Sequence, residues 1–153
     1  MIDPNLMAPC GLFCGACPIY VADHTNDQRL KEKLSAFYNV AMDEIACQGC
    51  LSDTLFSYCR VCEIKSCSAD KQNAGCHECD DFPCDLIEKF PIPEGKAVIL
   101  RSVPERKKLG NEKWVACETA RYTCPHCGGQ LFRGSRRCRT CKEPVDTMQS
   151  ATP

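Results

Sequence analysis

The sequence predicts a small α+β protein that is held together by metal ions, with short helices and a C-terminal zinc ribbon. Three observations support this fold class. Cysteine makes up 16 of the 153 residues, a fraction typical of disulfide-linked or metal-stapled chains. The cysteines are also counted in the apolar fraction of 44%, so the rest can build only small cores that need staples. Most of the cysteines stand in closely spaced groups.

Composition also narrows the class of protein. No stretch approaches the ~18 apolar residues that a membrane-spanning helix needs. The first nine residues contain no basic segment and no apolar segment, so no secretory signal is expected. The cytoplasm keeps thiols reduced, and many cysteines there indicate bound metal rather than disulfides. We therefore expect a cytoplasmic metal-binding protein with no membrane partner.

Three regions are predicted, with opposite charges at the two ends. Residues 1–90 contain eleven cysteines and are expected to form a cysteine-rich metal-binding domain, residues 91–121 a linker and helical segment, and residues 122–147 the zinc ribbon. Residues 1–94 hold 7 Lys/Arg and 15 Asp/Glu, a net charge of −8, whereas residues 95–153 hold 12 and 5, a net charge of +7. The asymmetry predicts either different partners for the two halves or attraction between them.

The first region is expected to contain three helices. Asn26 is a suitable N-cap for the longest, with Asp27 in its first turn. Its apolar residues recur at helical spacing and share one face: Leu30, Leu34, Phe37 and Tyr38. Shorter helices are expected to begin at Pro18 and at Pro83, because proline is tolerated at the first helical position.

The middle region is expected to contain a short apolar run and two helices. The run covers residues 97–100 and ends before Pro104, which is expected to open a basic helix that stops at Gly110. A second helix is predicted over residues 112–121, with Trp114 turned inward.

The clearest motif lies in the third region. Two C-x2-C pairs separated by ten residues can place four thiolates around one ion: Cys124, Cys127, Cys138 and Cys141. Gly128-Gly129 permits the positive φ angles of such a turn, and residues 130–133 are expected to form a short strand. The motif predicts a zinc ribbon, and an iron site with the same four ligands is the alternative.

Residues 10–84 are also predicted to bind metal. Their eleven cysteines are Cys10, Cys14, Cys17, Cys47, Cys50, Cys59, Cys62, Cys67, Cys76, Cys79 and Cys84. They include four C-x2-C pairs and a near-repeat, in which Cys59-x2-Cys62-x4-Cys67 is echoed 17 residues later. Random scatter would not produce this pattern.

The grouping of these eleven ligands stays open, because connectivity cannot be read from sequence. In one partition, the pairs that begin at Cys14 and Cys47 form one site, and the pairs that begin at Cys59 and Cys76 form a second site. The remaining three cysteines could then hold a third ion with His24 or His77, or one cysteine is free. The C-x3-C-x2-C run that begins at Cys10 has the spacing that binds a [4Fe–4S] cluster in radical enzymes, but Ala16 replaces their usual aromatic residue and no barrel of adequate length follows, so a radical enzyme is not expected. An iron–sulfur cluster of another type within residues 10–84 is the alternative to zinc.

Four motifs in order carry a resemblance to a known family. They are the opening C-G-x-x-C-G-x-C-P at Cys10, the knuckle 47–50, the C-x2-C-x4-C run 59–67 and the acidic C-x-E-C-D-D-F-P-C run 76–84. Over about residues 8–90 the chain resembles an uncharacterised cysteine-rich family of unknown function, common in anaerobic bacteria and archaea. Some members are similar to this chain in adding a C-terminal zinc ribbon. The resemblance implies metal binding, in particular zinc, and a cytoplasmic setting, and it implies no known reaction.

No catalytic or cofactor-binding motif is present. Cys117, outside the metal-binding runs, is expected to be a buried helix residue rather than a reactive thiol. The predicted function is a zinc-binding module for binding or assembly, and the alternative is an iron–sulfur electron-transfer or redox accessory subunit. A protein partner is expected. Nucleic acid is the second candidate, because basic residues surround Phe132 on the ribbon: Arg133, Arg136, Arg137, Arg139 and Lys142.

Overall fold

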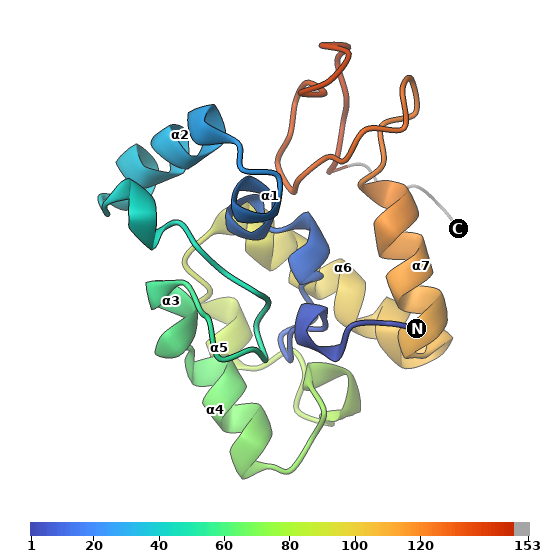
Figure 1. The fold of residues 1–153 in the computed structure, drawn as a ribbon. Helices are drawn as coiled ribbons and strands as arrows, with labels where there is room; N and C mark the ends of the chain where they lie inside the picture. Colours follow the sequence, from blue (N-terminus) through green and yellow to red (C-terminus); the bar gives the residue numbers. More distant parts are fainter. Residues whose placement is uncertain (149–153) are drawn as a thin grey trace.

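The structure is a computed structural model in which residues 1–148 are described. Short helices run throughout this part of the chain (Figure 1). The α-helices are α1 Pro18–His24, α2 Gln28–Tyr38, α3 Ser57–Arg60, α4 Glu63–Asp70, α5 Asp85–Glu88, α6 Pro93–Leu109 and α7 Asn111–Arg121. Single 3-10 turns form at Pro4–Leu6, Cys14–Ala16, Met42–Glu44 and Cys76–Glu78.

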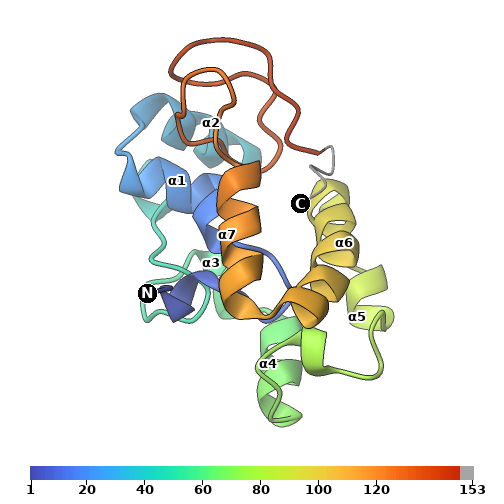
Figure 2. The same ribbon diagram turned by 90° about the vertical axis from the view of Figure 1, so that its right-hand side faces the viewer.

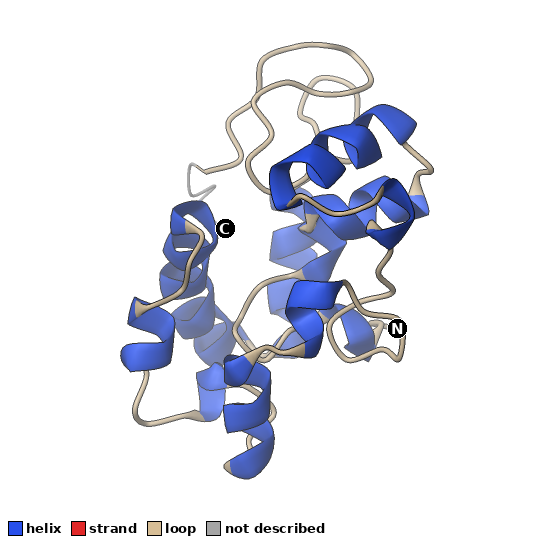
Figure 3. Cartoon of the chain, turned by 90° about the vertical axis from the view of Figure 1, so that its left-hand side faces the viewer, coloured by secondary structure: helices blue, strands red, loops and turns tan. Residues whose placement is uncertain are grey.

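The predicted α+β class is wrong, because residues 1–148 contain helices and loops but no strand (Figure 3). Only isolated antiparallel bridges form, such as Thr123 with Gln130. The expected strand at 130–133 fails because its backbone N–H groups bond to three different segments. Leu131 N–H donates to Tyr122, Phe132 N–H to the Ser135 hydroxyl and Arg133 N–H to Ala16. A strand needs successive bonds to one neighbour.

The helices of the first region lie close to their predicted places. α1 begins at Pro18, as predicted. The N-cap of α2 is Asp27 rather than Asn26, and its carboxylate accepts a 3.0 Å hydrogen bond from Leu30 N–H. Phe37, predicted on the apolar face, is 73% exposed, so the buried stripe of α2 is narrower than its sequence pattern indicates. The helix predicted from Pro83 begins two residues later as α5.

The middle region forms a helical hairpin, in which α6 and α7 meet at Gly110 (Figure 2). α6 is one continuous helix from Pro93 to Leu109, so the predicted break before Pro104 is wrong. Pro104 lacks the N–H group that would bond within the helix. The helix continues through it because Ile99 and Val103 are fully buried in a hydrophobic cluster with the Cys10 segment. α7 matches the predicted second helix.

The buried apolar residues of the described part of the chain form three small clusters rather than one large core. The first joins α1 and α2, and the second joins the Cys10 segment to α4, α5 and α6. The third surrounds the fully buried Trp114 of α7 and extends into residues 122–148, which lie over the end of α7 and beside α1 and α2 (Figures 1 and 2). The cysteine-bearing segments therefore contribute to each core.

Buried hydrogen bonds fix the Cys10 segment against α6. The Ser102 hydroxyl donates to the Gly11 carbonyl over 2.6 Å and accepts the indole N–H of Trp114 over 2.8 Å. The Arg106 guanidinium donates to the Ala8 carbonyl over 3.2 Å and lies 4.8 Å from the Trp114 ring centre. Residues far along the chain thus hold the first cysteine in place.

A buried ion network joins α6 to α7. Glu118 of α7 is fully buried, and its two carboxylate oxygens accept bonds of 2.7 and 3.2 Å from Arg101 of α6. Arg121 also pairs with Glu118, and Glu105 lies 2.7 Å from Arg101 and 3.4 Å from Arg121. Two guanidiniums and two carboxylates balance in charge, which a buried network requires.

Candidate metal centre

The four cysteines of the predicted ribbon converge on one point. The sulfurs of Cys124, Cys127, Cys138 and Cys141 all lie within 4.8 Å of one another. Two of the separations are 3.7 Å, between Cys124 and Cys141, and 3.6 Å, between Cys127 and Cys138. A tetrahedral ion with metal–sulfur bonds of about 2.3 Å requires sulfurs about 3.8 Å apart. The four sulfurs could therefore hold one metal ion with little movement.

Local backbone geometry presents these sulfurs to one another. Gly128 has a φ angle of +74°, and its N–H donates to the Cys124 carbonyl to close the first knuckle. The N–H of Gly129 points at the Cys127 sulfur over 3.4 Å. The backbone N–H of Cys141 is the main cause that lowers the pKa of Cys138 to about 6. N–H donors directed at sulfur favour the thiolate, which is the form that binds metal.

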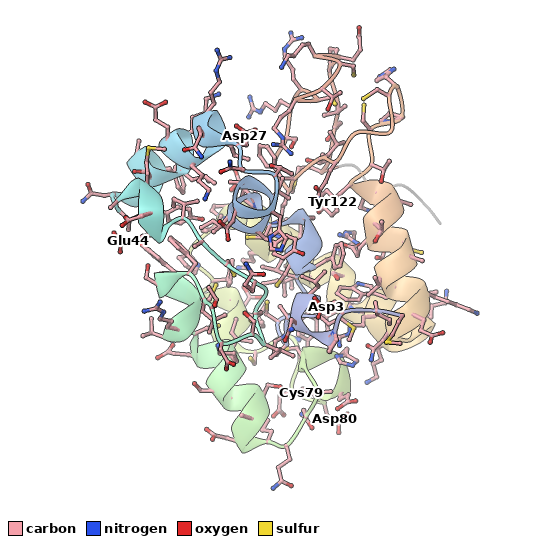
Figure 4. The ribbon with its side chains drawn as sticks, viewed as in Figure 1. Asp3, Asp27, Glu44, Cys79, Asp80 and Tyr122 are labelled. Carbon is pink, nitrogen blue, oxygen red and sulfur yellow. The ribbon has the colours of Figure 1, made fainter. Side chains whose placement is uncertain are left out.

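The ribbon segment, residues 122–148, is bonded to the N-terminal half of the chain. Arg139 forms an ion pair of 2.5 Å with Asp27, the N-cap of α2, which Figure 4 labels beside the ribbon segment. The side-chain amide of Gln130 donates to the Gly15 carbonyl over 3.0 Å. A basic residue of the ribbon thus contacts the acidic half of the chain, as expected if the two oppositely charged halves attract each other.

Four other cysteines line one small cavity at the opposite end of the molecule, where Figure 4 labels Cys79. The cavity has a volume of about 20 Å³ and apolar walls, which is room for a single water-sized occupant. We call these cysteines the lower group: Cys67, Cys76, Cys79 and Cys84. Lys71 donates to the Cys79 sulfur over 3.4 Å and is held by Asp81 at 2.6 Å.

Seven further cysteines interact electrostatically with one another, and we call them the upper group: Cys10, Cys14, Cys17, Cys47, Cys50, Cys59 and Cys62. The side-chain interaction between Cys14 and Cys50 is the main cause that raises the pKa of Cys14 and lowers that of Cys50 to about 7. Burial, and then the charges of Cys17 and Cys50, raise the pKa of Cys59. These thiols therefore interact with one another electrostatically.

The two groups differ from the partition considered from the sequence. Cys67 and Cys84 share a cavity with the pair that begins at Cys76, whereas Cys59 interacts with the upper group and Cys62 interacts with cysteines of both groups. Within residues 1–148, only the ribbon cysteines have all their ligand atoms within 4.8 Å. Metal binding by the other eleven cysteines therefore stays a prediction.

The two histidines that could complete a site have other surroundings. Nδ1 of the His24 ring donates to the Tyr20 carbonyl over 3.1 Å, and the ring stacks on the Tyr20 ring. His77 is buried with an unpartnered Nδ1 atom, and burial, followed by the charge of Arg106, lowers its pKa. Cys117 is partly buried on α7 and lies outside every cysteine group described above.

Sequence reasoning missed the residues around the cysteines. Ser102 and Arg106 fix the Cys10 segment, and Lys71 donates to a cysteine sulfur. Arg133, predicted as a contact for phosphate, donates its backbone N–H to the Ala16 carbonyl. In the sequence these residues are simply polar or charged positions within helical or ribbon segments. Such a position does not indicate which residue it contacts until the fold is known.

The fold and the ribbon define a class: a helical, cysteine-rich protein with a four-thiol centre that could bind one metal ion. Residues 6–89 match the model of a family described as "Protein of unknown function (DUF3795)". The match covers more than half of the chain, and the chain belongs to this family. The family has no assigned function, and the ribbon lies outside the matched residues.

No curated protein and no solved structure showed significant similarity to the chain. Within residues 1–148, no helix combines the length and the hydropathy that crossing a bilayer demands.

Proposed function

We propose that this protein is a cytoplasmic zinc-binding module that acts by binding another macromolecule rather than by catalysis. The observation that carries the proposal is the ribbon, whose sulfurs lie 3.6 and 3.7 Å apart, close to the separation in a zinc tetrathiolate. Four thiolates complete the coordination of such an ion and leave no position for substrate, so its role is structural. A cytoplasmic setting fits a chain whose 16 cysteines are all free thiols.

The lower group is proposed as a second zinc site. Its four cysteines surround a cavity of about 20 Å³ with walls that include Ile64 and Ile87. Lys71 would favour the thiolate form of Cys79, to which it donates. Metal binding there would require the sulfurs to move closer together, since they do not all lie within 4.8 Å of one another. The upper group is proposed to hold the remaining metal.

One observation favours a second candidate function, an iron–sulfur redox accessory subunit. The upper group brings seven thiols together, more than a single tetrahedral ion can use. An iron–sulfur cluster is also held by four cysteine thiolates, and the C-x3-C-x2-C run of the upper group has a spacing known from such clusters. This alternative concerns the upper group only, since the ribbon has the four ligands of a mononuclear site.

A protein partner is proposed because aromatic side chains form an exposed surface at the end of α2. Phe37 is 73% exposed and Tyr58 is 56% exposed. Their rings contact the ring of Tyr38 at centroid distances of 4.9 and 5.2 Å, respectively. Exposed aromatic residues are enriched at protein interfaces. Nucleic acid is less favoured, because Arg139 is already paired with Asp27.

Metal analysis of protein purified without oxygen tests the proposal. Zinc in the absence of visible absorption supports a zinc module, whereas a brown protein that contains iron and sulfide supports the redox alternative. Binding to single-stranded and duplex oligonucleotides at low and moderate salt tests the partner. Tight, salt-sensitive binding that is lost on replacing Arg136 and Arg137 by Ala would make nucleic acid the partner.

A further inference from the structure

Cys127 differs from the other cysteines of the chain because it is exposed. All sixteen cysteines lie within residues 1–148, and the other fifteen are buried or partly buried. Among the ribbon ligands, Cys124 is 2% exposed and Cys138 is fully buried. The ribbon segment itself lies at the end of the molecule opposite α4 (Figure 1). Solvent therefore reaches the four-thiol centre most directly at Cys127.

The residue beside Cys127 leaves one side of its sulfur uncovered. Gly129 donates its backbone N–H to this sulfur over 3.4 Å. A Cβ atom at position 129 would lie 3.2 Å from the sulfur and 2.9 Å from the hydroxyl oxygen of Thr140. A larger residue at this position would thus press against the sulfur, whereas glycine places no side chain over it.

A second thiol lies within reach of Cys127. The sulfur of Cys138 is 3.6 Å from that of Cys127, and an S–S bond of about 2.0 Å requires the two atoms to approach by roughly 1.6 Å. Both residues are ligands of the proposed ribbon ion, which binds them as thiolates. The thiolate is the form of cysteine that reacts with oxidants, and susceptibility also increases with exposure. Cys127 combines the two properties.

We infer that Cys127 is a site of oxidation by hydroperoxides and that Cys138 is the thiol that resolves it, so that oxidation releases the ribbon ion. The inference rests on the proposed function, because the two residues are ligands of the proposed zinc. It adds a regulation of that site: the ribbon keeps its ion under reducing conditions and loses it when a hydroperoxide is present.

The chemistry takes two steps and consumes one hydroperoxide. The Cys127 thiolate attacks an oxygen of the hydroperoxide, so that an S–O bond forms, the O–O bond breaks, and the leaving oxyanion takes a proton from solvent. The Cys138 thiolate then attacks the sulfur of the resulting sulfenic acid. An S–S bond forms, the S–O bond breaks, and hydroxide leaves and takes a second proton. The two thiolates together lose two electrons, which reduce the hydroperoxide. The remaining pair, Cys124 and Cys141, cannot complete a tetrahedral site.

The oxidation also acts on the contact between the ribbon and the N-terminal half. Arg139 directly follows Cys138, pairs with Asp27 over 2.5 Å and donates to the hydroxyl of Thr25 over 3.2 Å. Drawing Cys138 toward Cys127 shifts the knuckle that carries Arg139. Oxidation is therefore expected to loosen the ribbon from the start of α2, and so to change the surface that the module presents to a partner.

The test adds hydrogen peroxide stepwise to the zinc-loaded full chain and counts the remaining ions by native mass spectrometry. Trypsin cuts after Arg133, Arg136 and Arg137, so a Cys127–Cys138 disulfide appears as a linked pair of peptides. The first equivalent of peroxide should remove one ion and produce this pair. Dimedone, which traps sulfenic acids, should label Cys127 before any other cysteine. Dithiothreitol with added zinc should restore the ion.

Two variants separate the exposed thiol from the other ligands. Cys127→His and Cys141→His both leave three cysteines and one histidine, a set that also binds zinc, but only Cys127→His removes the exposed thiol. At a fixed peroxide concentration, Cys127→His should keep the ribbon ion at least about tenfold longer than wild type, because its remaining thiolates are less exposed. Cys141→His should lose the ion about as fast as wild type. Equal rates of loss in the two variants would contradict the inference.

The wild-type chain decides the question even if a variant fails to bind zinc. A first disulfide other than Cys127–Cys138 would overturn the inference, as would a ribbon that keeps its zinc while the less exposed cysteines are oxidised. Both results would leave the proposed function intact. The ribbon ion is identified by its loss in Cys127→Ser, and a wild-type ribbon that binds no zinc would contradict the inference and the proposed function together.

Discussion

Replacing Glu118 by Gln should destabilise the helical hairpin by about 3 kcal/mol. Glu118 is fully buried and accepts bonds from Arg101 at 2.7 and 3.2 Å, as well as from Arg121. Removing one partner of a buried pair typically costs about 3–5 kcal/mol, because the remaining charge stays out of water. The lower end of this range applies here, since Glu105 still lies 2.7 Å from Arg101 and 3.4 Å from Arg121.

Thermal unfolding of the metal-loaded chain measures this effect, with the fluorescence of Trp114 as the probe. Trp114 is the single tryptophan, is fully buried and lies on the same hairpin. For a chain of this size, a loss of about 3 kcal/mol lowers the melting temperature by roughly 6–12 °C. The control is Glu112→Gln, an exposed position in the first turn of α7 that should change stability by less than about 0.5 kcal/mol. A Glu118→Gln variant that melts within about 2 °C of wild type would refute the reasoning.

Three further predictions concern the ribbon, Ser102 and Asp27. Cys127→Ser should remove one ion equivalent and leave the helical circular dichroism signal, because the ribbon ligands are all local; loss of all metal would contradict this. Ser102→Ala should cost about 1–3 kcal/mol in a chemical denaturation, since it leaves a buried indole N–H without an acceptor; an unchanged midpoint would be the contrary result. Asp27 has a pKa lowered below its ordinary 3.8, first by the Leu30 N–H and then by Arg139. The stability that the Asp27 carboxylate contributes is therefore present above about pH 4 and is lost as the pH falls through its lowered pKa. Asp27→Asn should therefore reduce the loss of stability at acid pH. An unchanged dependence of stability on pH would contradict this prediction.

Local features of this protein could be predicted from its sequence. The ribbon is one case, because Cys124 and Cys141 lie within eighteen residues and the spacing of short knuckles leaves few arrangements. α1 and α7 are others, since Pro18 marks a helix start and Trp114 marks the buried face of α7. In each case the residues that determine the feature are close together in the sequence, within one helix or one loop.

Features that depend on distant contacts could not be predicted. The grouping of Cys67 with Cys84 arises from the packing of α4 on α5, which no spacing rule encodes. The α+β class was wrong because the ribbon backbone bonds to segments such as Ala16, over a hundred residues away, instead of to a neighbouring strand. Pro104 predicts the start of a helix, and this prediction is wrong. α6 continues through Pro104 because Ile99 is buried, which the sequence does not show.

The central claim is that this cysteine-rich chain is held together by zinc in its N-terminal half as well as in the ribbon. The most direct measurement is the metal content of the full chain, purified without oxygen, with its absorption spectrum and the count repeated in Cys127→Ser. At four thiolates per ion, the account predicts about three zinc ions per chain, no visible absorption, and the loss of one ion in the variant. A single zinc ion that disappears in Cys127→Ser, or iron with sulfide in place of zinc, would contradict the account.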